Sequence, residues 1–80
     1  MPHQKPLDKL FDMGALAGVR VRLTKNWYYH KQGEIGIILS SYERKRSDGS
    51  AERRVKLIIG NSMPYDFHLQ HAKQTLEVLR

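Results

Sequence analysis

The sequence has no cysteine, which excludes disulfide bonds, thiolate-bound metals and cysteine nucleophiles and fits a reducing compartment. No apolar run approaches the roughly 18–20 residues that cross a membrane, and the first residues do not lead into a signal-peptide core. At 80 residues the chain is also too short for a second hydrophobic core. These absences predict one small, soluble, cytoplasmic domain without a membrane partner.

Positive charge is in excess and is unevenly placed. The chain is 40% hydrophobic and 28% charged, with a formal net charge of +6. Ten basic and four acidic residues fall between Arg20 and Lys56, so this window carries the whole excess while the rest of the chain is balanced. Such a concentration predicts an acidic partner, either nucleic acid or an acidic protein surface.

Residues 1–17 are expected to form an N-terminal arm with a short helix. Pro6 suits the first helical position, and Leu7, Leu10 and Phe11 lie on one helical face. A helix of about two turns is unstable alone, so this apolar face must pack on the rest of the domain or on a partner.

From residue 18 onward the hydrophobic period changes to two, which indicates β-strands. Val21 and Leu23 alternate with Arg20 and Arg22, a pattern typical of a half-buried strand with a basic outer face. We expect further strands over residues 34–43, 53–59, 63–67 and 75–79, and a helical turn over residues 68–74. The apolar residues expected to share the inward faces of these strands are Ile35, Ile37, Leu39, Val55, Leu57, Ile59, Met63, Tyr65, Phe67, Leu76 and Val78.

The register of the central hairpin follows from its turn residues. Residues 47–49 suit a three-residue loop with Gly49 in the left-handed conformation, which pairs Arg46 with Ser50. A two-residue turn would instead split the apolar faces. With the longer loop, the expected opposite pairs are Ile37 and Ile59, Leu39 and Leu57, Glu43 and Arg53, and Arg44 and Glu52.

The expected fold is all-β: a small five-stranded antiparallel barrel over residues 18–80, with a helical turn before the last strand. This order of elements resembles the SH3-like barrels. Gly18-Val-Arg-Val-Arg-Leu followed by Gly33-Glu-Ile-Gly-Ile-Ile resembles the paired strands of KOW domains in ribosomal and transcription-elongation proteins. Gly36 matches a glycine that lets the second strand bend in that family. The resemblance implies binding of RNA or of a ribonucleoprotein.

Two other families share this layout. Arg20-Val-Arg-Leu, Trp27-Tyr-Tyr and Glu34-Ile-Gly-Ile resemble a small accessory protein of photosystem I and related electron-transport barrels, which dock on a larger complex. The plasmid-borne type of dihydrofolate reductase is also a short barrel, but its Val-Gln-Ile-Tyr stretch is replaced here by Tyr65-Asp-Phe-His. The first resemblance implies an accessory role in a protein complex, and the second gives little support to an enzyme.

The sequence carries no recognisable catalytic motif: phosphate-binding glycine loops, paired carboxylates within one motif and metalloprotease helices are all missing. His68 and His71 lie near Asp66, but structural zinc sites usually need four ligands, so these histidines are expected to be solvated or to cap a helix. We therefore expect no enzyme activity, no cofactor and no metal.

The residues expected to contact an acidic partner combine basic side chains with exposed aromatic rings. Clusters of basic side chains contact phosphates, and exposed aromatic rings stack on unpaired bases. We expect a nucleic-acid-binding domain; the alternative is an accessory subunit that docks through the same face on an acidic protein. The oligomeric state is left open. The predicted contact residues are Arg20, Arg22, Tyr28, Tyr29, Tyr42, Arg44, Lys45, Arg46, Arg54 and Lys56.

Overall fold

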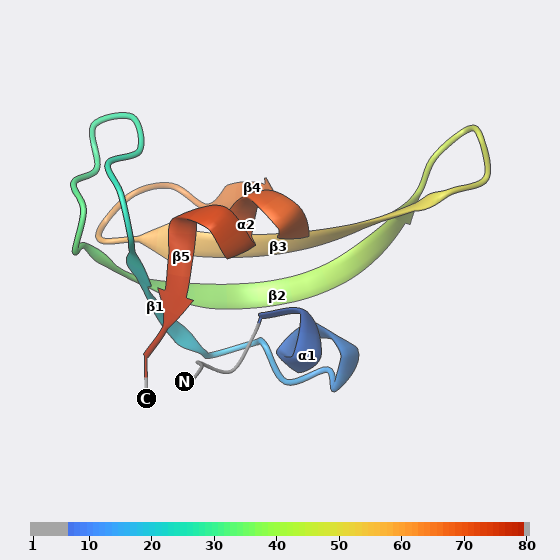
Figure 1. The fold of residues 1–80 in the computed structure, drawn as a ribbon, viewed down its shortest axis with the longest axis horizontal. Coiled ribbons are helices and arrows are strands. Elements are labelled where there is room, and N and C mark those ends of the chain that lie inside the picture. Colours follow the sequence, from blue (N-terminus) through green and yellow to red (C-terminus); the bar gives the residue numbers. More distant parts are fainter. Residues whose placement is uncertain (1–6, 80) are drawn as a thin grey trace.

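The computed structural model describes residues 7–79 and is mostly β-structure (Figure 1). The elements in chain order are α1 (Leu7–Asp12), β1 (Arg20–Leu23), β2 (Ile35–Lys45), β3 (Ala51–Ile59), β4 (Tyr65–His68), α2 (Leu69–Thr75) and β5 (Leu76–Val78). The expected first helical position, Pro6, lies outside the described residues. Within residues 7–79, neither helix has the length or the apolar character to cross a membrane.

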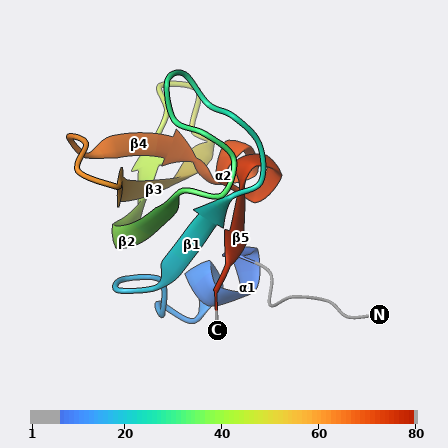
Figure 2. The ribbon, with the colours of Figure 1, turned by 90° about the vertical axis from the view of Figure 1, so that its left-hand side faces the viewer.

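The five strands form one antiparallel open sheet in the order β4-β3-β2-β1-β5. The long strands β2 and β3 make its centre, and the hairpin that joins them extends far beyond the other strands (Figure 1). A view turned by 90° shows that the sheet is strongly twisted, because β1 and β5 run at a steep angle to β3 and β4 (Figure 2). In this strand order the first strand, β1, and the last strand, β5, are neighbours.

One face of the sheet carries the hydrophobic core. Val21, Ile38, Val55, Leu57 and Ile59 are completely buried there. The two helices add Leu7, Leu69 and Ala72 to the same cluster, and Leu10 and Phe11 pack against it. The apolar face of α1 thus packs on the domain itself. The opposite side of the sheet is called the outer face below.

The predicted alternation of β1 and the predicted hairpin loop are both confirmed. Val21 and Leu23 are buried, while Arg20 and Arg22 are exposed. In the hairpin, the amide of Arg46 donates to the carbonyl of Ser50 at 2.8 Å, and Gly49 has a φ of 91°. Positive φ is strained for residues with a Cβ, which explains the glycine. The predicted pairs of Glu43 with Arg53 and of Arg44 with Glu52 are present.

The predicted inward face of β2 is wrong. Ile35, Ile37 and Leu39 are 39%, 45% and 41% exposed, and Ile38 is buried in their place. The reason is a β-bulge: Ile38 pairs with Leu57 and Ser40 with Lys56, so Leu39 is an extra residue without a partner on β3. Beyond the bulge the register shifts by one residue, and the expected pairs of Ile37 with Ile59 and Leu39 with Leu57 do not form.

The start of β2 takes its face from β1. Cross-strand neighbours point to the same side of a sheet, and the buried Val21 pairs with Gly36. A Cβ on Gly36 would lie 2.7 Å from the carbonyl oxygen of Ile58, so only glycine fits this close approach. The expected inward position of Met63 is also wrong, because this residue is 79% exposed and precedes β4.

The observed burial predicts that truncation of two aliphatic residues, both expected in the core, will reduce stability by very different amounts. Leu57→Ala removes a completely buried side chain and should destabilise the domain by roughly 2–5 kcal/mol. Ile37→Ala truncates an exposed side chain and should cost less than about 1 kcal/mol. Urea unfolding of both variants measures the difference; equal destabilisation would contradict the observed face of β2.

Candidate functional site

The loop between β1 and β2 ends in a tight turn that presents two tyrosines to solvent. Trp27 and His30 exchange two backbone hydrogen bonds of 2.9 Å each, which leaves Tyr28 and Tyr29 at the centre of the turn. Their side chains are 77% and 80% exposed. The expected exposure of both tyrosines is therefore confirmed. The ring of Tyr28 lies against Trp27, and the ring of Tyr29 lies 5.3 Å from that of His30.

Tyr28 adopts an unusual backbone conformation. Its φ is 56°, and it is the one residue other than glycine with a positive φ in the described part of the chain. This conformation costs a residue with a Cβ roughly 1–2 kcal/mol, and such strain tends to occur at functional sites. The ring of Tyr28 stacks on Trp27 with a centroid distance of 4.4 Å. The turn therefore holds the exposed ring of Tyr28 in a defined position, at the cost of a strained backbone conformation.

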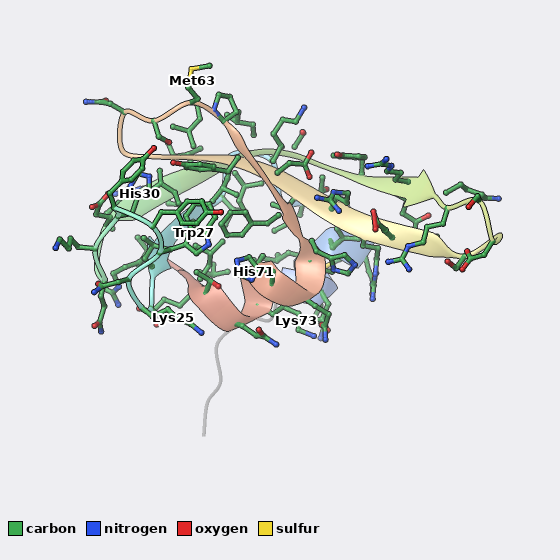
Figure 3. All side chains as sticks on the ribbon, turned by 90° about the horizontal axis from the view of Figure 1, so that it is seen from above. Lys25, Trp27, His30, Met63, His71 and Lys73 are labelled. Atoms are coloured by element: carbon green, nitrogen blue, oxygen red, sulfur yellow. The ribbon has the colours of Figure 1, made fainter. Side chains whose placement is uncertain are left out.

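Trp27 anchors this turn to the body of the domain. Its ring meets Tyr65 edge-on at a centroid distance of 4.6 Å and contacts Phe67 at 4.8 Å. In the view from above, Trp27 and His30 lie at one end of the sheet, and His71 of α2 lies beyond Trp27 (Figure 3). The tryptophan is thus folded against the domain, and the two tyrosines next to it are exposed.

A second anchor is a chain of three polar side chains that fixes His30. Its Nδ1 lies 3.0 Å from Oε1 of Glu34, and its Nε2 lies 2.8 Å from the hydroxyl of Tyr65. With the proton on Nδ1, the ring donates to Glu34 and accepts the hydroxyl hydrogen of Tyr65. The imidazole is 8% exposed, so we assign these contacts to holding the loop.

Glu34 closes the loop from its other end. Its Oε2 accepts a 2.9 Å hydrogen bond from the amide of Lys31. This backbone hydrogen bond, together with the one from His30, lowers the pKa of the Glu34 carboxyl below its ordinary value. The carboxylate is the form that holds the loop. Sequence patterns did not single out Glu34, because its partners are recognisable only once the loop is closed.

Two lysines flank the tyrosine turn. Lys25 and Lys31 are exposed, and neither forms an ion pair with any residue of the described range 7–79. Neither lysine was among the predicted contact residues, although both belong to the positively charged window. Their spacing around Trp27 and the two tyrosines was the available signal. The loop thus combines two exposed rings with two lysines that form no ion pair within residues 7–79, although the charge of Lys31 also acts on the nearby carboxylate of Glu34.

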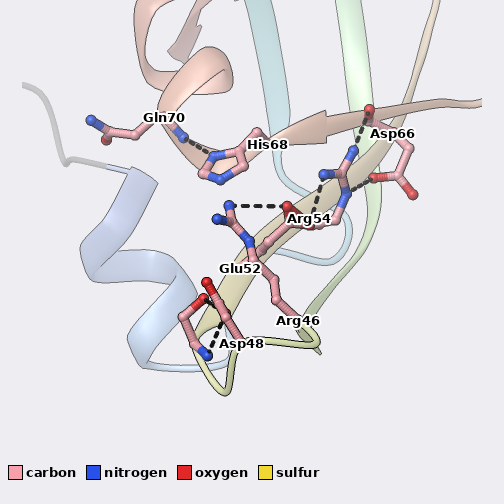
Figure 4. A network of polar contacts seen from close by, with 8 residues as sticks. Arg46, Asp48, Glu52, Arg54, Asp66, His68 and Gln70 are labelled. Carbon is pink, nitrogen blue, oxygen red and sulfur yellow. Dashed lines mark hydrogen bonds and ion pairs between the residues drawn. The ribbon is translucent and has the colours of Figure 1, made fainter.

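Several of the predicted basic contacts are neutralised by carboxylates of the sheet. Nε of Arg22 donates to Oε2 of Glu77 at 2.7 Å. Nε of Arg54 donates to Oδ1 of Asp66 at 2.7 Å, and its Nη1 lies 3.1 Å from Glu52 (Figure 4). Glu52 also pairs with Arg46 at 3.1 Å. These arginines are therefore engaged within the domain.

Tyr42 belongs to the same network. Its hydroxyl donates to the second carboxylate oxygen of Asp66, and this hydrogen bond raises the pKa of the Tyr42 phenol. Burial would raise the pKa of Asp66, but the hydrogen bonds from Tyr42 and Arg54 outweigh it and lower that pKa. The ring of Tyr42 is 36% exposed, about half as much as those of Tyr28 and Tyr29. Tyr42 is therefore less available for stacking.

The remaining predicted contacts lie in separate places. Arg20 on β1 and Lys56 on β3 face outward, but the exposed aliphatic side chains of β2 lie between these strands. Arg44, Lys45 and Arg46 lie at the hairpin, at the opposite end of the molecule from the tyrosine turn (Figure 1). The predicted residues thus form three areas: the turn, the outer face and the hairpin.

The two histidines near Asp66 make different contacts at the start of α2. His68 caps the helix, its Nδ1 accepting from the amide of Gln70 at 3.3 Å (Figure 4). The ring of His71 packs 4.9 Å from that of Phe67. Within residues 7–79, no group of three or more histidine, cysteine, aspartate or glutamate side chains is arranged to hold a metal ion.

Neither a protein-family model, a curated protein nor a solved structure matches this chain. The function must therefore be argued from the site itself.

The carboxyl of Glu34 predicts a pH-dependent loop. Because its folded pKa is lowered, its contribution to stability is complete above its ordinary value of about 4.5 and is lost as pH falls through the lower folded value. Fluorescence of Trp27, the single tryptophan, should report a local change below about pH 4.5 before global unfolding. Glu34→Gln removes the carboxylate at every pH, so this variant should show the altered Trp27 fluorescence already at pH 7. A variant whose loop amides keep parent-like hydrogen-exchange protection at pH 7 would contradict the assigned role of Glu34.

Proposed function

We propose that this chain is a non-enzymatic nucleic-acid-binding domain that holds unpaired RNA on the tyrosine turn. The observation that carries the proposal is the exposure of Tyr28 and Tyr29, 77% and 80%, on a turn fixed by Trp27 and His30. Aromatic rings held in this way stack on successive bases, each worth roughly 1–3 kcal/mol.

Preorganisation supports this use of the turn. A flexible loop would lose conformational entropy on binding, whereas here the packing of Trp27 and the polar contacts of His30 have already ordered the backbone. The left-handed Tyr28 fits the same interpretation, since strain is retained where surrounding contacts enforce it. The rings therefore meet a base without further ordering of the loop.

Lys25 and Lys31 supply the electrostatic part of the proposed site. Both are exposed and form no ion pair among residues 7–79, so they are available to phosphates on either side of the stacked bases. Arg44 and Lys45 at the hairpin form no ion pair within residues 7–79 and make a second basic area, too far along the sheet to belong to the same contact.

The topology supports a closer assignment of the fold. A sheet in the order β4-β3-β2-β1-β5, with a helical segment directly before the last strand, is the arrangement expected of an SH3-like barrel. Gly36, where a Cβ would lie 2.7 Å from the carbonyl oxygen of Ile58, is in the position that matches the glycine of the second KOW strand. We therefore propose that the domain is an SH3-like barrel with a KOW-like strand pair, and that RNA or a ribonucleoprotein is its partner in the cytoplasm.

Fluorescence anisotropy with a labelled 12-residue oligouridylate tests this proposal over roughly 50–200 mM salt. Tyr28→Gly removes one ring and relieves the left-handed strain, so the fold should survive. This variant and Tyr29→Ala should each bind roughly 5- to 150-fold more weakly, with an unchanged salt slope. Replacing Lys25 and Lys31 with Gln should instead flatten the slope by roughly 1.4, because each phosphate contact contributes about 0.7.

The matched control is Lys9→Gln. Lys9 is an exposed lysine of α1 that has no ion pair within the described residues, so its loss should change neither affinity nor salt slope. Turn variants that bind like the parent would remove the site from the turn. A parent chain that binds no oligonucleotide at about 50 mM salt would contradict the proposal and leave the alternative of an accessory subunit on an acidic protein.

A further inference from the structure

The outer face of the sheet contains a shallow groove of about 340 Å³ where β1, β2 and β3 lie side by side. Ile35, Ile37 and Leu39 of β2 and Ile58 of β3 give it an apolar lining. The three β2 side chains are 39%, 45% and 41% exposed. Contiguous apolar surface of this kind on a small domain marks an interaction site.

Nothing in the described part of the chain covers this groove. The buried residues of both helices, among them Leu7, Leu69 and Ala72, belong to the core cluster on the other face. The groove also has no role in the tyrosine turn, whose anchors Trp27 and His30 pack on that opposite side with Tyr65. A different partner must therefore account for it.

Positive charge lines and borders the groove. Arg20 is the charged residue of the lining, and Lys56 lies on the same face of β3 two residues from Ile58. Neither cation forms an ion pair within residues 7–79. The carboxylates Glu52, Asp66 and Glu77 of this face form ion pairs with other arginines. Lys56 lies opposite Asp66 and interacts with that carboxylate electrostatically, so Arg20 is the cation that is available at the groove. An occupant that combines apolar side chains with carboxylates would satisfy both features of the groove.

A second copy of this chain does not supply that combination. In a two-fold interface each groove would lie against its own equivalent, which places Arg20 and Lys56 next to the same cations of the other copy. Nucleic acid offers phosphates to these cations but no aliphatic groups for the isoleucines. A protein segment that carries both aliphatic and acidic side chains matches the surface best.

We propose that the outer groove is a docking site for an acidic segment of a partner protein. Its apolar side chains pack on Ile35, Ile37 and Leu39, and one of its carboxylates pairs with Arg20. The site is independent of RNA binding at the tyrosine turn, so either proposal can fail alone.

A displayed library of random 16-residue peptides, selected on the full chain, tests this site. The double variant Ile35→Thr, Ile37→Thr serves as the counter-selection target, because threonine keeps the branched shape at an exposed strand position. We expect the enriched peptides to combine aspartate or glutamate with aliphatic residues. Their Kd should rise at least tenfold with Arg20→Gln or Ile37→Thr and should not change with Met63→Thr, an exposed apolar residue outside the groove.

Amide shifts of the peptide complex should cluster on β1, β2 and β3, and Tyr28→Gly should leave peptide binding intact. Failure to enrich peptides over the counter-selection, or enrichment of basic peptides, would overturn the proposal. So would association of the parent with itself, or with vesicles of phosphatidylcholine and phosphatidylserine, when either is abolished by Ile37→Thr. Loss of oligouridylate binding in turn variants bears only on the tyrosine turn.

Discussion

The bulge at Leu39 reconciles two constraints on β2 that a regular strand could not meet together. At its start, pairing of Gly36 with the buried Val21 points the even-numbered side chains inward. At its end, the three-residue hairpin loop pairs Ser41 with the buried Val55, so the odd-numbered side chains point inward. Because side chains alternate along a strand, one extra residue must separate these two phases.

The same bulge decides what the outer face offers to a partner. If the hairpin register continued unbroken along β2, Ile35, Ile37 and Leu39 would point into the core. The bulge lets the start of β2 keep the face set by β1, so these side chains lie between Arg20 and Lys56. The outer face, expected from strand alternation to be basic, therefore carries an apolar strip with cations on both sides. The exposed rings lie on a different element, the turn after β1, next to two lysines that form no ion pair in the described part of the chain. The turn and the outer groove are therefore separate sites.

Local patterns predicted the elements that depend on neighbouring residues. The alternation around Val21 and Leu23 defined β1, and the turn residues before Ser50 defined the hairpin loop. The face of β2 was not predictable in the same way, because Ile37 and Ile38 are both apolar and alternation alone does not choose between them. That choice comes from pairing with β1, which is a tertiary contact.

The candidate sites show the same division. The exposure of Tyr28 and Tyr29 followed from their position in a polar loop. The neutralisation of Arg22 by Glu77, 55 residues away, depends on β1 and β5 being neighbours in the sheet. The contact of His30 with Tyr65 likewise joins residues 35 positions apart. Such pairs become visible only when strand order is known.

Two single-residue deletions test this account most directly: one removes the bulge residue Leu39 from β2, and the other removes Lys56 from the facing strand β3. Removing Leu39 should leave a regular ladder in which Ile38 and Ser41 keep their faces, so the domain should unfold cooperatively and within about 2 kcal/mol of the parent. Removing Lys56 from the facing strand should turn the side chains of one half of β3 to the opposite face of the sheet, which should abolish cooperative unfolding. Urea titration of both deletions gives the answer: equal tolerance of the two, or loss of the fold on deletion of Leu39, would contradict Leu39 as the single extra residue that joins the two halves of β2.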